Sequence, residues 1–418
     1  MLQNHLIVPA ARPSDLKVNN RMQILELFKS GSVYSVADLA REVGVSRQTV
    51  MKGIQFFLEK GLIVSDGKAD SGSMGGKRAE LFTLSADQFL FCVHICPDCA
   101  SIVLMNFRRD IIDKQILQSI TGLEVSAFVE LVSKECERMA ADRGIDMANV
   151  KGLCITTTGM VTEEGMLLCG PLSSSWGRNI PIGQMFSRRL GGDIRVITEN
   201  LGKVCGSAYL HQQKATEERI ATLLTYWDDI SCCLIANGVI VNGKNDLVAE
   251  FGHMILCPED DEVCSCGSRG CFERQVSVRR LRRLGSEMME RFPNSSLKHL
   301  LPDHLTIREI FAASARGDGL GQWLSGYAGG QFANALRNLA LVFNPDRVVL
   351  QGDYANADGV FIDTLRRELA GFRMVLKDDP KTTPFALELD LRPLDDLTIL
   401  GSYTLLIDHL FAEETTYA

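Results

Sequence analysis

The sequence has no long hydrophobic run, no signal peptide, no internal repeat and no excess of positive charge. None of its apolar runs reaches the length of about 20 residues that a membrane-spanning helix needs. Its first residues, MLQNHLIVPAARPSD, lack the charged start and long apolar middle of a signal peptide. We therefore expect a cytoplasmic protein without membrane insertion. Its 13 cysteines should then be reduced thiols or metal ligands.

The lack of positive charge limits how the chain can bind nucleic acid. Its net charge of −8 argues against uniform coating of DNA or RNA. The charge is uneven, because residues 1–86 carry 11 Lys and Arg against 8 Asp and Glu, whereas the remainder carries 33 against 44. At 418 residues and 46% apolar composition, we expect two or three hydrophobic cores. A slightly basic N-terminal segment is compatible with a local DNA contact, but only a motif can support one.

The N-terminal segment contains the pattern of a helix-turn-helix. The stretch NNRMQILELFKSG predicts one helix, and YSVADLAREVGVSRQTVMKGIQFFLEKGLI predicts two more. Ser35 and Ser46 are candidate N-caps, Gly44 suits the tight turn, and Val45 suits the space between the helices. In this motif the second helix enters the major groove. The early residues of that helix suit contacts with bases and phosphates: Ser46, Arg47, Gln48, Thr49 and Lys52.

The next stretch, LIVSDGKADSGSMGGKRAELFTLS, predicts two strands around a Gly-rich tip. Such a hairpin is the wing of a winged helix, and its Lys77 and Arg78 can reach the DNA backbone or the minor groove. We therefore expect a winged helix-turn-helix DNA-binding domain over residues 1–86. The alternative is a helical hairpin that serves only for packing.

After Asp87 the pattern changes to strands that alternate with helices. FLFCVHI, ASIVLMNF and DIIDKQIL predict three strands, followed by an amphipathic helix and further strands. A second set begins near Arg219 with IATLLTYW and SCCLIANGVIVNG, and ends with a small-residue helix and a buried strand. Strands followed by alternating helices and strands thus occur in two successive parts of the chain. This arrangement predicts an α/β fold with two lobes that face a cleft, over residues 87–216 and 217–418.

Four residues within EFGHMILCPEDDEVCSCGSRGCFE have the spacing of a metal site. They follow the pattern H-x10-C-x-C-x4-C and are His253, Cys264, Cys266 and Cys271. Thiolates with one imidazole favour Zn²⁺ in a tetrahedral site, and four protein ligands make that site structural. Cys257 lies nearby, so it is an alternative ligand. The remaining alternative is a set of free thiols on a loop.

Four segments resemble motifs of the ROK family, which contains repressors, open reading frames and sugar kinases. GLCITTTGMV is similar to the family's strand-to-Gly turn, and ITENLGKVCGSAY to its E-N-D-A-N-A segment. EFGHMILCP is similar to its E-x-G-H element, and CSCGSRGCFERQVS to its C-x-C-G-x-x-G-C-x-E signature. The N-terminal winged helix resembles the repressor branch, with its glucose, xylose and N-acetylglucosamine regulators. The resemblance implies a two-lobed actin-like (ribonuclease-H-like) ATPase-type fold.

The resemblance also implies a sugar-binding cleft. In the family the matching side chains of Glu250, His253 and Glu273 hold sugar hydroxyls, while zinc holds the loop that carries them. Asn200 would add an amide contact, and Thr158 in the Gly turn faces the same cleft. Carboxylates and amides suit a polyol because they bind several hydroxyls at fixed spacing. The alternative for the two glutamates is that they are solvated loop carboxylates.

Several departures from the family argue against phosphoryl transfer. The catalytic aspartate of E-N-D is replaced by Leu201, which cannot accept a proton. HICPDCAS and WDDISCCLIANG replace two Gly-rich phosphate loops, and QGDYANADG keeps only part of a third Gly-rich element. We therefore assign no catalytic residue and predict that the chain is not an enzyme.

Together these patterns predict a DNA-binding transcriptional regulator, a repressor of carbohydrate-related genes that senses a sugar or a sugar derivative. A homodimer or a dimer of dimers would bind a double-stranded, roughly palindromic operator. Ligand closing the cleft would change the spacing of the two DNA-reading heads. One alternative is a ROK sugar kinase with a fused DNA-binding domain. Another is a binding scaffold that responds to a protein partner, as some glucose repressors of the family do with a membrane transport protein.

Overall fold

The chain divides into two compact units. Its computed structural model describes residues 13–29, 31–68, 78–162, 164–170, 173–191, 193–213, 217–243, 248–370 and 383–416. Unit 1 comprises Met1–Ile155, Pro181–Thr198 and Tyr403–Ala418, and unit 2 comprises Thr156–Ile180 and Glu199–Ser402. The units therefore group distant parts of the chain, and the domain boundaries expected after residues 86 and 216 stay predictions.

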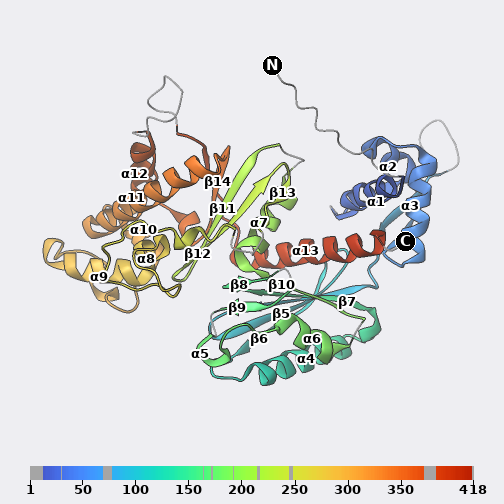
Figure 1. The fold of residues 1–418 in the computed structure, drawn as a ribbon, viewed down its shortest axis with the longest axis horizontal. Helices are drawn as coiled ribbons and strands as arrows, with labels where there is room; N and C mark the ends of the chain where they lie inside the picture. Colours follow the sequence, from blue (N-terminus) through green and yellow to red (C-terminus); the bar gives the residue numbers. More distant parts are fainter. Residues whose placement is uncertain are drawn as a thin grey trace, which may run out of the picture. The chain divides into compact units, whose positions relative to one another are not determined.

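The N-terminal part of unit 1 consists of three helices and a sheet with the strand order β1-β3-β2 (Figure 1). The elements are α1 (Pro13–Lys29), β1 (Tyr34–Ser35), α2 (Val36–Val43), α3 (Arg47–Glu59), β2 (Ile63–Lys68) and β3 (Glu80–Leu84). The three helices and the hairpin strands β2 and β3 were expected from the sequence, whereas α1 begins six residues earlier than predicted and β1 was not predicted. Ser35 forms a capping box with Asp38, and Gly44 ends α2 in the left-handed conformation at φ 73°. The Ser46 hydroxyl accepts the N–H of Thr49 and caps α3.

The three helices pack around one apolar centre. Val50, Ile54 and Phe57 of α3 are fully buried, as is Ile24 of α1. Gly53 lets α1 and α3 approach closely, because a Cβ at this position would lie 2.9 Å from the Ile24 Cδ1. The buried side of α3 is therefore set by its contact with α1, which leaves the opposite side of α3 exposed.

The remainder of unit 1 is built on a five-stranded sheet with the order β10-β7-β4-β5-β6. Its strands are β4 (Phe89–Ile95), β5 (Cys99–Asn106), β6 (Ile111–Gln118), β7 (Val150–Thr157) and β10 (Arg195–Asn200). β7 and β10 each run on into unit 2 by two residues. The short helix η1 (Met147–Asn149) precedes β7, and α4 (Val125–Asp142) and α6 (Ile182–Leu190) cover one face of the sheet (Figure 1). Their contact includes Phe128 and Phe186, whose rings meet edge to face at 6.3 Å.

Unit 2 has its own five-stranded sheet, in the order β13-β12-β11-β14-β15. β11 (Arg219–Tyr226) pairs antiparallel with β12 (Asp229–Ala236) and parallel with β14 (Arg347–Gly352). β13 (Val239–Ile240) and β15 (Ala386–Leu389) form the two edges. The expected mixed α/β architecture with two sheets is therefore confirmed.

Helices cover both faces of this second sheet. Residues of β11 alternate, so that Ala221 and Leu223 pack in the cluster containing α11, whereas Leu224 packs in the cluster containing α7. The helices and short helices of unit 2 are α5 (Ser173–Trp176), α7 (Leu201–Gln212), η2 (Phe251–His253), α8 (Phe272–Val276), α9 (Val278–Met288), η3 (Met289–Arg291), η4 (Lys298–Leu300), α10 (Ile307–Ala315), α11 (Gly319–Val342), η5 (Asp353–Asn356) and α12 (Gly359–Ala370). A small two-stranded sheet joins β8 (Met160–Val161) and β9 (Leu167–Cys169).

The last helix, α13 (Leu394–Thr416), contributes to both units. In unit 2 its Leu397 packs in the cluster that contains α7. In unit 1 the Tyr403 hydroxyl donates to the Phe107 carbonyl at 2.7 Å, and Asp408 forms an ion pair with Lys29 of α1. The Lys29 side chain is only 3% exposed, whereas that of Asp408 is 43% exposed, so the pair lies at the edge of the buried region. Among the helices that the structure describes, none is both long and apolar enough to cross a bilayer.

Gly401 allows the closest approach of α13 to α7. A Cβ at this position would lie 1.9 Å from the Val204 carbonyl oxygen, so Gly401→Ala must displace the helix backbone. We expect this variant to be less stable by about 1–3 kcal/mol, measured by thermal or urea unfolding. Gly330→Ala is the matched control, because a Cβ at Gly330 in α11 meets no atom within 4 Å. That variant should gain about 0.4–1 kcal/mol, and equal effects of the two substitutions would contradict the packing argument.

Candidate functional site

Unit 2 encloses a cavity of about 680 Å³, which is within the size range of small-molecule sites. The turn after β7, the residue before α7, the start of β12, η2 and the loop before α8 all contribute to its wall. All five residues predicted to bind ligand lie in this wall: Thr158, Asn200, Glu250, His253 and Glu273. The tertiary structure therefore brings together residues that are separated by more than 100 positions in the chain.

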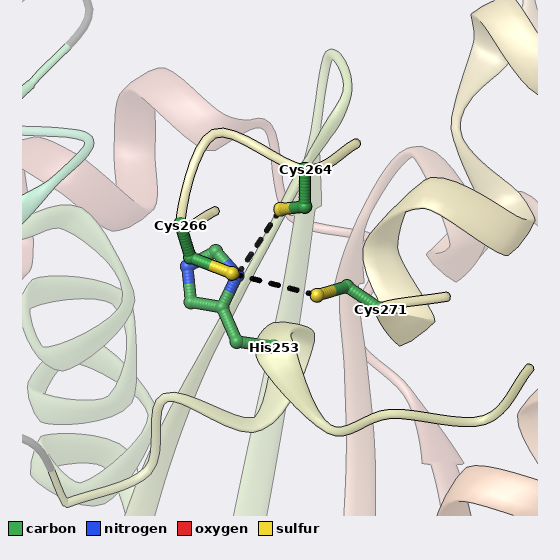
Figure 2. A group of neighbouring side chains, drawn as sticks. All are labelled: His253, Cys264, Cys266 and Cys271. Atoms are coloured by element: carbon green, nitrogen blue, oxygen red, sulfur yellow. Dashed lines mark hydrogen bonds between the residues drawn. The ribbon is translucent and has the colours of Figure 1, made fainter. Parts of the chain in front are cut away.

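The predicted metal ligands form a compact cluster beside this cavity. The donor atoms of His253, Cys264, Cys266 and Cys271 all lie within 4.8 Å of one another (Figure 2). The Cys266 and Cys271 sulfurs are 3.6 Å apart, and the Cys264 sulfur lies 3.5 Å from the His253 Nδ1. Donors around a tetrahedral Zn²⁺ with Zn–S bonds of about 2.3 Å are separated by about 3.5–3.8 Å. The four residues thus fit a tetrahedral metal ion.

Two glycines give the cysteine loop its shape. Gly267 and Gly270 have φ values of 91° and 71°, in the left-handed region that glycine tolerates. A Cβ at Gly270 would lie 1.8 Å from the Cys257 carbonyl oxygen. The Gly270 carbonyl in turn accepts the N–H of Leu256 at 2.8 Å. Cys257 therefore supports the loop through its backbone and lies outside the metal cluster, which argues against its role as an alternative ligand.

The cysteine loop is also fastened to the core of unit 2. Phe272 follows the last ligand directly and is fully buried. Its ring meets Phe332 of α11 at 5.0 Å and Phe251 of η2 at 5.7 Å. Both segments that supply metal ligands, η2 and the cysteine loop, are therefore joined through one aromatic cluster.

His253 connects the cluster to the cavity, because its two ring nitrogens face different groups. The Nδ1 lies 3.5 Å from the Cys264 sulfur and 3.6 Å from Glu273, whereas the Nε2 lies 3.8 Å from Glu250. A metal bound at Nδ1 would leave Nε2 on the side of Glu250. The two roles predicted for His253, metal ligand and cavity residue, are compatible for this reason.

The two predicted glutamates have different surroundings. The Glu273 side chain is 4% exposed and accepts the Cys264 thiol at 3.1 Å, so it lies against the metal cluster. Glu250 is more open, with 31% of its side chain exposed. Burial raises the pKa of Glu250, and the nearby Glu273 charge adds to this effect, whereas His253 opposes it. Glu273 is thus held against the cysteine loop, whereas Glu250 is partly exposed beside His253.

Asn200 has a second role that the sequence does not reveal. Its side-chain oxygen accepts the Gly202 N–H at 2.7 Å, which caps α7, and its amide nitrogen donates to the Gly159 carbonyl at 2.6 Å. One N–H and one lone pair of the amide remain for a ligand. Asn200 therefore fixes the Gly turn to the start of α7.

Of the three threonines in the Gly turn, Thr158 lines the cavity. Thr156 and Thr157 are fully buried, and the Thr156 hydroxyl pairs with Ser402 at 2.9 Å. Leu201 is likewise fully buried, in an apolar cluster with Cys205, Ala208, Leu224 and Leu397. The position that matches the family's catalytic aspartate thus belongs to the core of unit 2.

Three charged cavity residues were missed as ligand-site candidates: Arg178, Asp229 and Arg274. The Arg274 side chain is 9% exposed, and its Nη2 lies 3.6 Å from Glu273. Burial raises the pKa of Asp229 to about 6, and the Glu273 charge adds to this shift. Arg274 directly follows a signature glutamate, so its position in the motif was the one signal that could have identified it.

The candidate DNA contacts of the α3 region lie together on its exposed N-terminal turn. Arg47, Gln48 and Lys52 are exposed. Ser46 and Thr49 share a hydrogen bond of 2.9 Å between their hydroxyls, so they also maintain the cap. Arg78 is exposed just before β3, and Lys77 lies outside the described residues.

Comparison with known proteins identifies the family. The family model described as "ROK family" matches residues 125–405, which is more than half of the chain. The chain belongs to the ROK family. The signature cysteines and the cavity residues of this ROK protein all lie within the matched region.

Its relatives include both regulators and kinases. It is 20% identical to a xylose repressor of Caldicellulosiruptor bescii, over 84% of this chain and 87% of the repressor. It is 23% identical to a glucokinase of Thermotoga maritima, over 51% of this chain and 66% of the glucokinase. A crystal structure of a ROK family transcriptional regulator, a homolog of the E. coli MLC protein, has the same fold with a TM-score of 0.76 and 17% identity. That match covers 96% of this chain and all of the regulator.

The four clustered donors predict a bound metal. We expect about one metal ion per chain in the purified protein, measured by elemental analysis. Cys271→Ser should remove most of it, because the fully buried Cys271 is one of only four donors. Cys257→Ser is the matched control and should keep its metal, since Cys257 lies outside the cluster. Full metal content in Cys271→Ser, or its loss in Cys257→Ser, would show that the ligand set is different.

Proposed function

We propose that this ROK protein is a DNA-binding transcriptional regulator, a repressor of carbohydrate-related genes that senses a sugar or a related small molecule and has no kinase activity. The observation that carries the proposal is the exposed, capped N-terminal turn of α3, with Arg47, Gln48 and Lys52 on one side. α3 is the second helix of the helix-turn-helix motif that begins with α2. In this motif the exposed first turn of the second helix contacts bases in the major groove.

The extent of the matches supports a regulator. The xylose repressor match covers 84% of this chain and the regulator structure 96%, whereas the glucokinase match covers 51%. We propose that residues 1–86 form a winged helix-turn-helix domain, followed by ROK lobes over 87–216 and 217–418. Two copies of the chain in a homodimer, or four in a dimer of dimers, would bind a roughly palindromic operator.

We assign different roles to the DNA-binding candidates. Arg47 and Gln48 would read base edges, and Lys52 would bind a phosphate, because these long side chains are exposed beyond the cap. Ser46 and Thr49 would position the helix and donate to phosphates. Lys77 and Arg78 would contact the backbone or the minor groove next to α3.

We propose Zn²⁺ as the metal, with a structural role. Three thiolates and one imidazole are its preferred ligands, and four protein donors leave no open position for catalysis. The ion would hold η2 and the cysteine loop together, and with them Glu250 and Glu273. These two carboxylates and the Nε2 of His253, with Thr158 and Asn200, would bind the hydroxyls of the effector.

The surroundings of Leu201 and Asp228 support the absence of kinase activity. A buried leucine at the position of the catalytic base cannot take a proton from a sugar hydroxyl. The turn between β11 and β12 carries Asp228, whose carboxylate accepts the Arg279 N–H at 3.3 Å and its Nη2 at 3.1 Å. An anionic turn bound to α9 in this way suits a triphosphate poorly. A sugar kinase with a fused DNA-binding domain is the second candidate, and the glucokinase relatives favour it.

Arg47→Ala tests the DNA-binding role. We expect it to weaken binding to DNA selected from a random pool by about 1–3 kcal/mol, because a bidentate contact to guanine is lost. Binding is measured by fluorescence anisotropy at fixed salt. Arg138→Ala is the control, since Arg138 is an exposed arginine of α4 that pairs with Glu135 and Asp142. Equal affinities of the Arg47→Ala and wild-type proteins would exclude Arg47 from the DNA contact.

A screen of sugars and sugar phosphates by thermal shift tests the sensing role. An effector at 100 times its dissociation constant should stabilise the protein by about 2.7 kcal/mol. Glu250→Gln should weaken this effect, whereas Glu259→Gln, an exposed neighbour in the same loop, should retain it. The hits are then tested for an effect on DNA affinity and for ATP consumption. ATP turnover above background with any of these sugars would favour the kinase candidate instead.

A further inference from the structure

Two cysteines face each other at the tip of the β4–β5 hairpin in unit 1. The sequence there is Cys96-Pro97-Asp98-Cys99, and the last ladder pair below it is Ile95 with Ala100. The Cys96 N–H donates to the Cys99 carbonyl at 2.8 Å, so the two cysteines continue the ladder as the next opposed pair. All 13 cysteines of the chain are thiols in this structure.

The backbone already provides the spacing of a disulfide. Directly opposed residues of an antiparallel pair have Cα atoms about 4.5–5.5 Å apart and side chains on the same face of the sheet. A disulfide needs Cα atoms about 4.4–6.8 Å apart. Cys96 and Cys99 are both half-buried, whereas Cys92, on the same face of β4, is 4% exposed. A small oxidant can therefore reach the pair at the tip more easily than the thiol behind it.

Contacts around the tip hold the turn in this geometry. The Thr121 hydroxyl lies 3.1 Å from the Pro97 carbonyl and 2.8 Å from the Asp98 carboxylate. The Asp98 carbonyl accepts the Ile120 N–H at 3.2 Å. His94, two residues before Cys96 and on the same face, places its Nδ1 3.8 Å from the Cys96 sulfur. An imidazole at this distance can take the thiol proton.

A pair of thiols could instead bind a metal ion together with further His, Cys, Asp or Glu side chains, but no such group is found around Cys96 and Cys99 among the described residues. Among the described residues, the one group of His, Cys, Asp and Glu donors that meets the geometry of a metal site is the His253 cluster. Thiol chemistry therefore fits the hairpin tip better than metal binding does. The glycines of a phosphate loop, which the family resemblance would place at this hairpin, are absent from it.

We propose that Cys96 and Cys99 form a reversible redox pair that a hydroperoxide oxidises to an intramolecular disulfide. His94 takes the Cys96 proton, and the thiolate attacks the hydroperoxide, which releases an alcohol or water and leaves a sulfenic acid on Cys96. The Cys99 sulfur then attacks the Cys96 sulfur and expels water. In balance, two thiols and one hydroperoxide give one disulfide, one alcohol and one water. A dithiol reductant reverses the change by two exchange steps. This site is independent of DNA binding and of the proposed effector.

The experiment uses the full-length protein with its metal, treated with hydrogen peroxide at one equivalent per chain and then alkylated. A protease that cleaves before aspartate separates Cys96, in residues 87–97, from Cys99, in residues 98–109. Mass spectrometry should find these peptides linked after oxidation and separate after dithiothreitol. In Cys99→Ser, a sulfenic acid on Cys96 should be trapped by dimedone, and Cys96→Ser should give neither product. His94→Gln should slow the linkage about tenfold at neutral pH, as expected when a thiol loses its base.

Three results would overturn the proposal. These are the absence of the linked peptides, a linkage of Cys92 in place of Cys96, or linkage that appears only after the metal is lost. Metal content and circular dichroism are measured on the same samples, so that a fold defect in a variant is recognised. Cys169→Ser serves as the control variant, because Cys169 is also half-buried but lies in unit 2, and it should not change the yield of the linked peptides.

Discussion

The candidate site of this protein depends on the convergence of one imidazole and three thiols. His253 comes from η2, and the three cysteines come from a loop more than ten residues later, yet their donor atoms lie within 4.8 Å of one another. Three thiols and one imidazole at this spacing could hold a cation, which would neutralise the thiolates and hold the loop together. Glu250 and Glu273 lie at the two sides of this cluster, next to different nitrogens of His253. The positions of both cavity carboxylates thus follow from the geometry of the cluster.

The second constraint is the start of α7, where the side-chain amide of Asn200 bonds to both the helix and the Gly turn. The Asn200 side chain caps the helix and donates to the carbonyl of Gly159, so one amide joins the Gly turn to the start of α7. Leu201, the next residue, packs into the core of unit 2. An aspartate at that position would be buried among apolar groups, where its charged form is unfavourable. Leu201 therefore contributes to packing in the core of unit 2.

The candidate DNA-contact residues and the cavity residues lie in different units, and α13 contributes residues to both units. The first part of α13 packs in the cluster that contains α7, and its last part forms an ion pair between Asp408 and Lys29 of α1. α1 in turn packs against the buried face of α3 through Ile24 and Gly53. Each of these contacts lies within a single unit.

By itself the sequence determined the local features of this protein. The helices and the hairpin strands of the N-terminal segment, the three strands that follow them, the caps at Ser35 and Ser46, the turn at Gly44 and the four metal-ligand candidates were predicted, because each depends on residues close in the chain. The motifs also identified the ROK family. Only the tertiary structure decided that Leu201 lies in the core, that Asn200 uses one N–H and one lone pair of its amide on the backbone, and that Arg274 lines the cavity. It also decided against Cys257, whose backbone supports the loop that the other cysteines form. The direction of a side chain depends on which distant segment packs against it, and a single sequence does not contain that information.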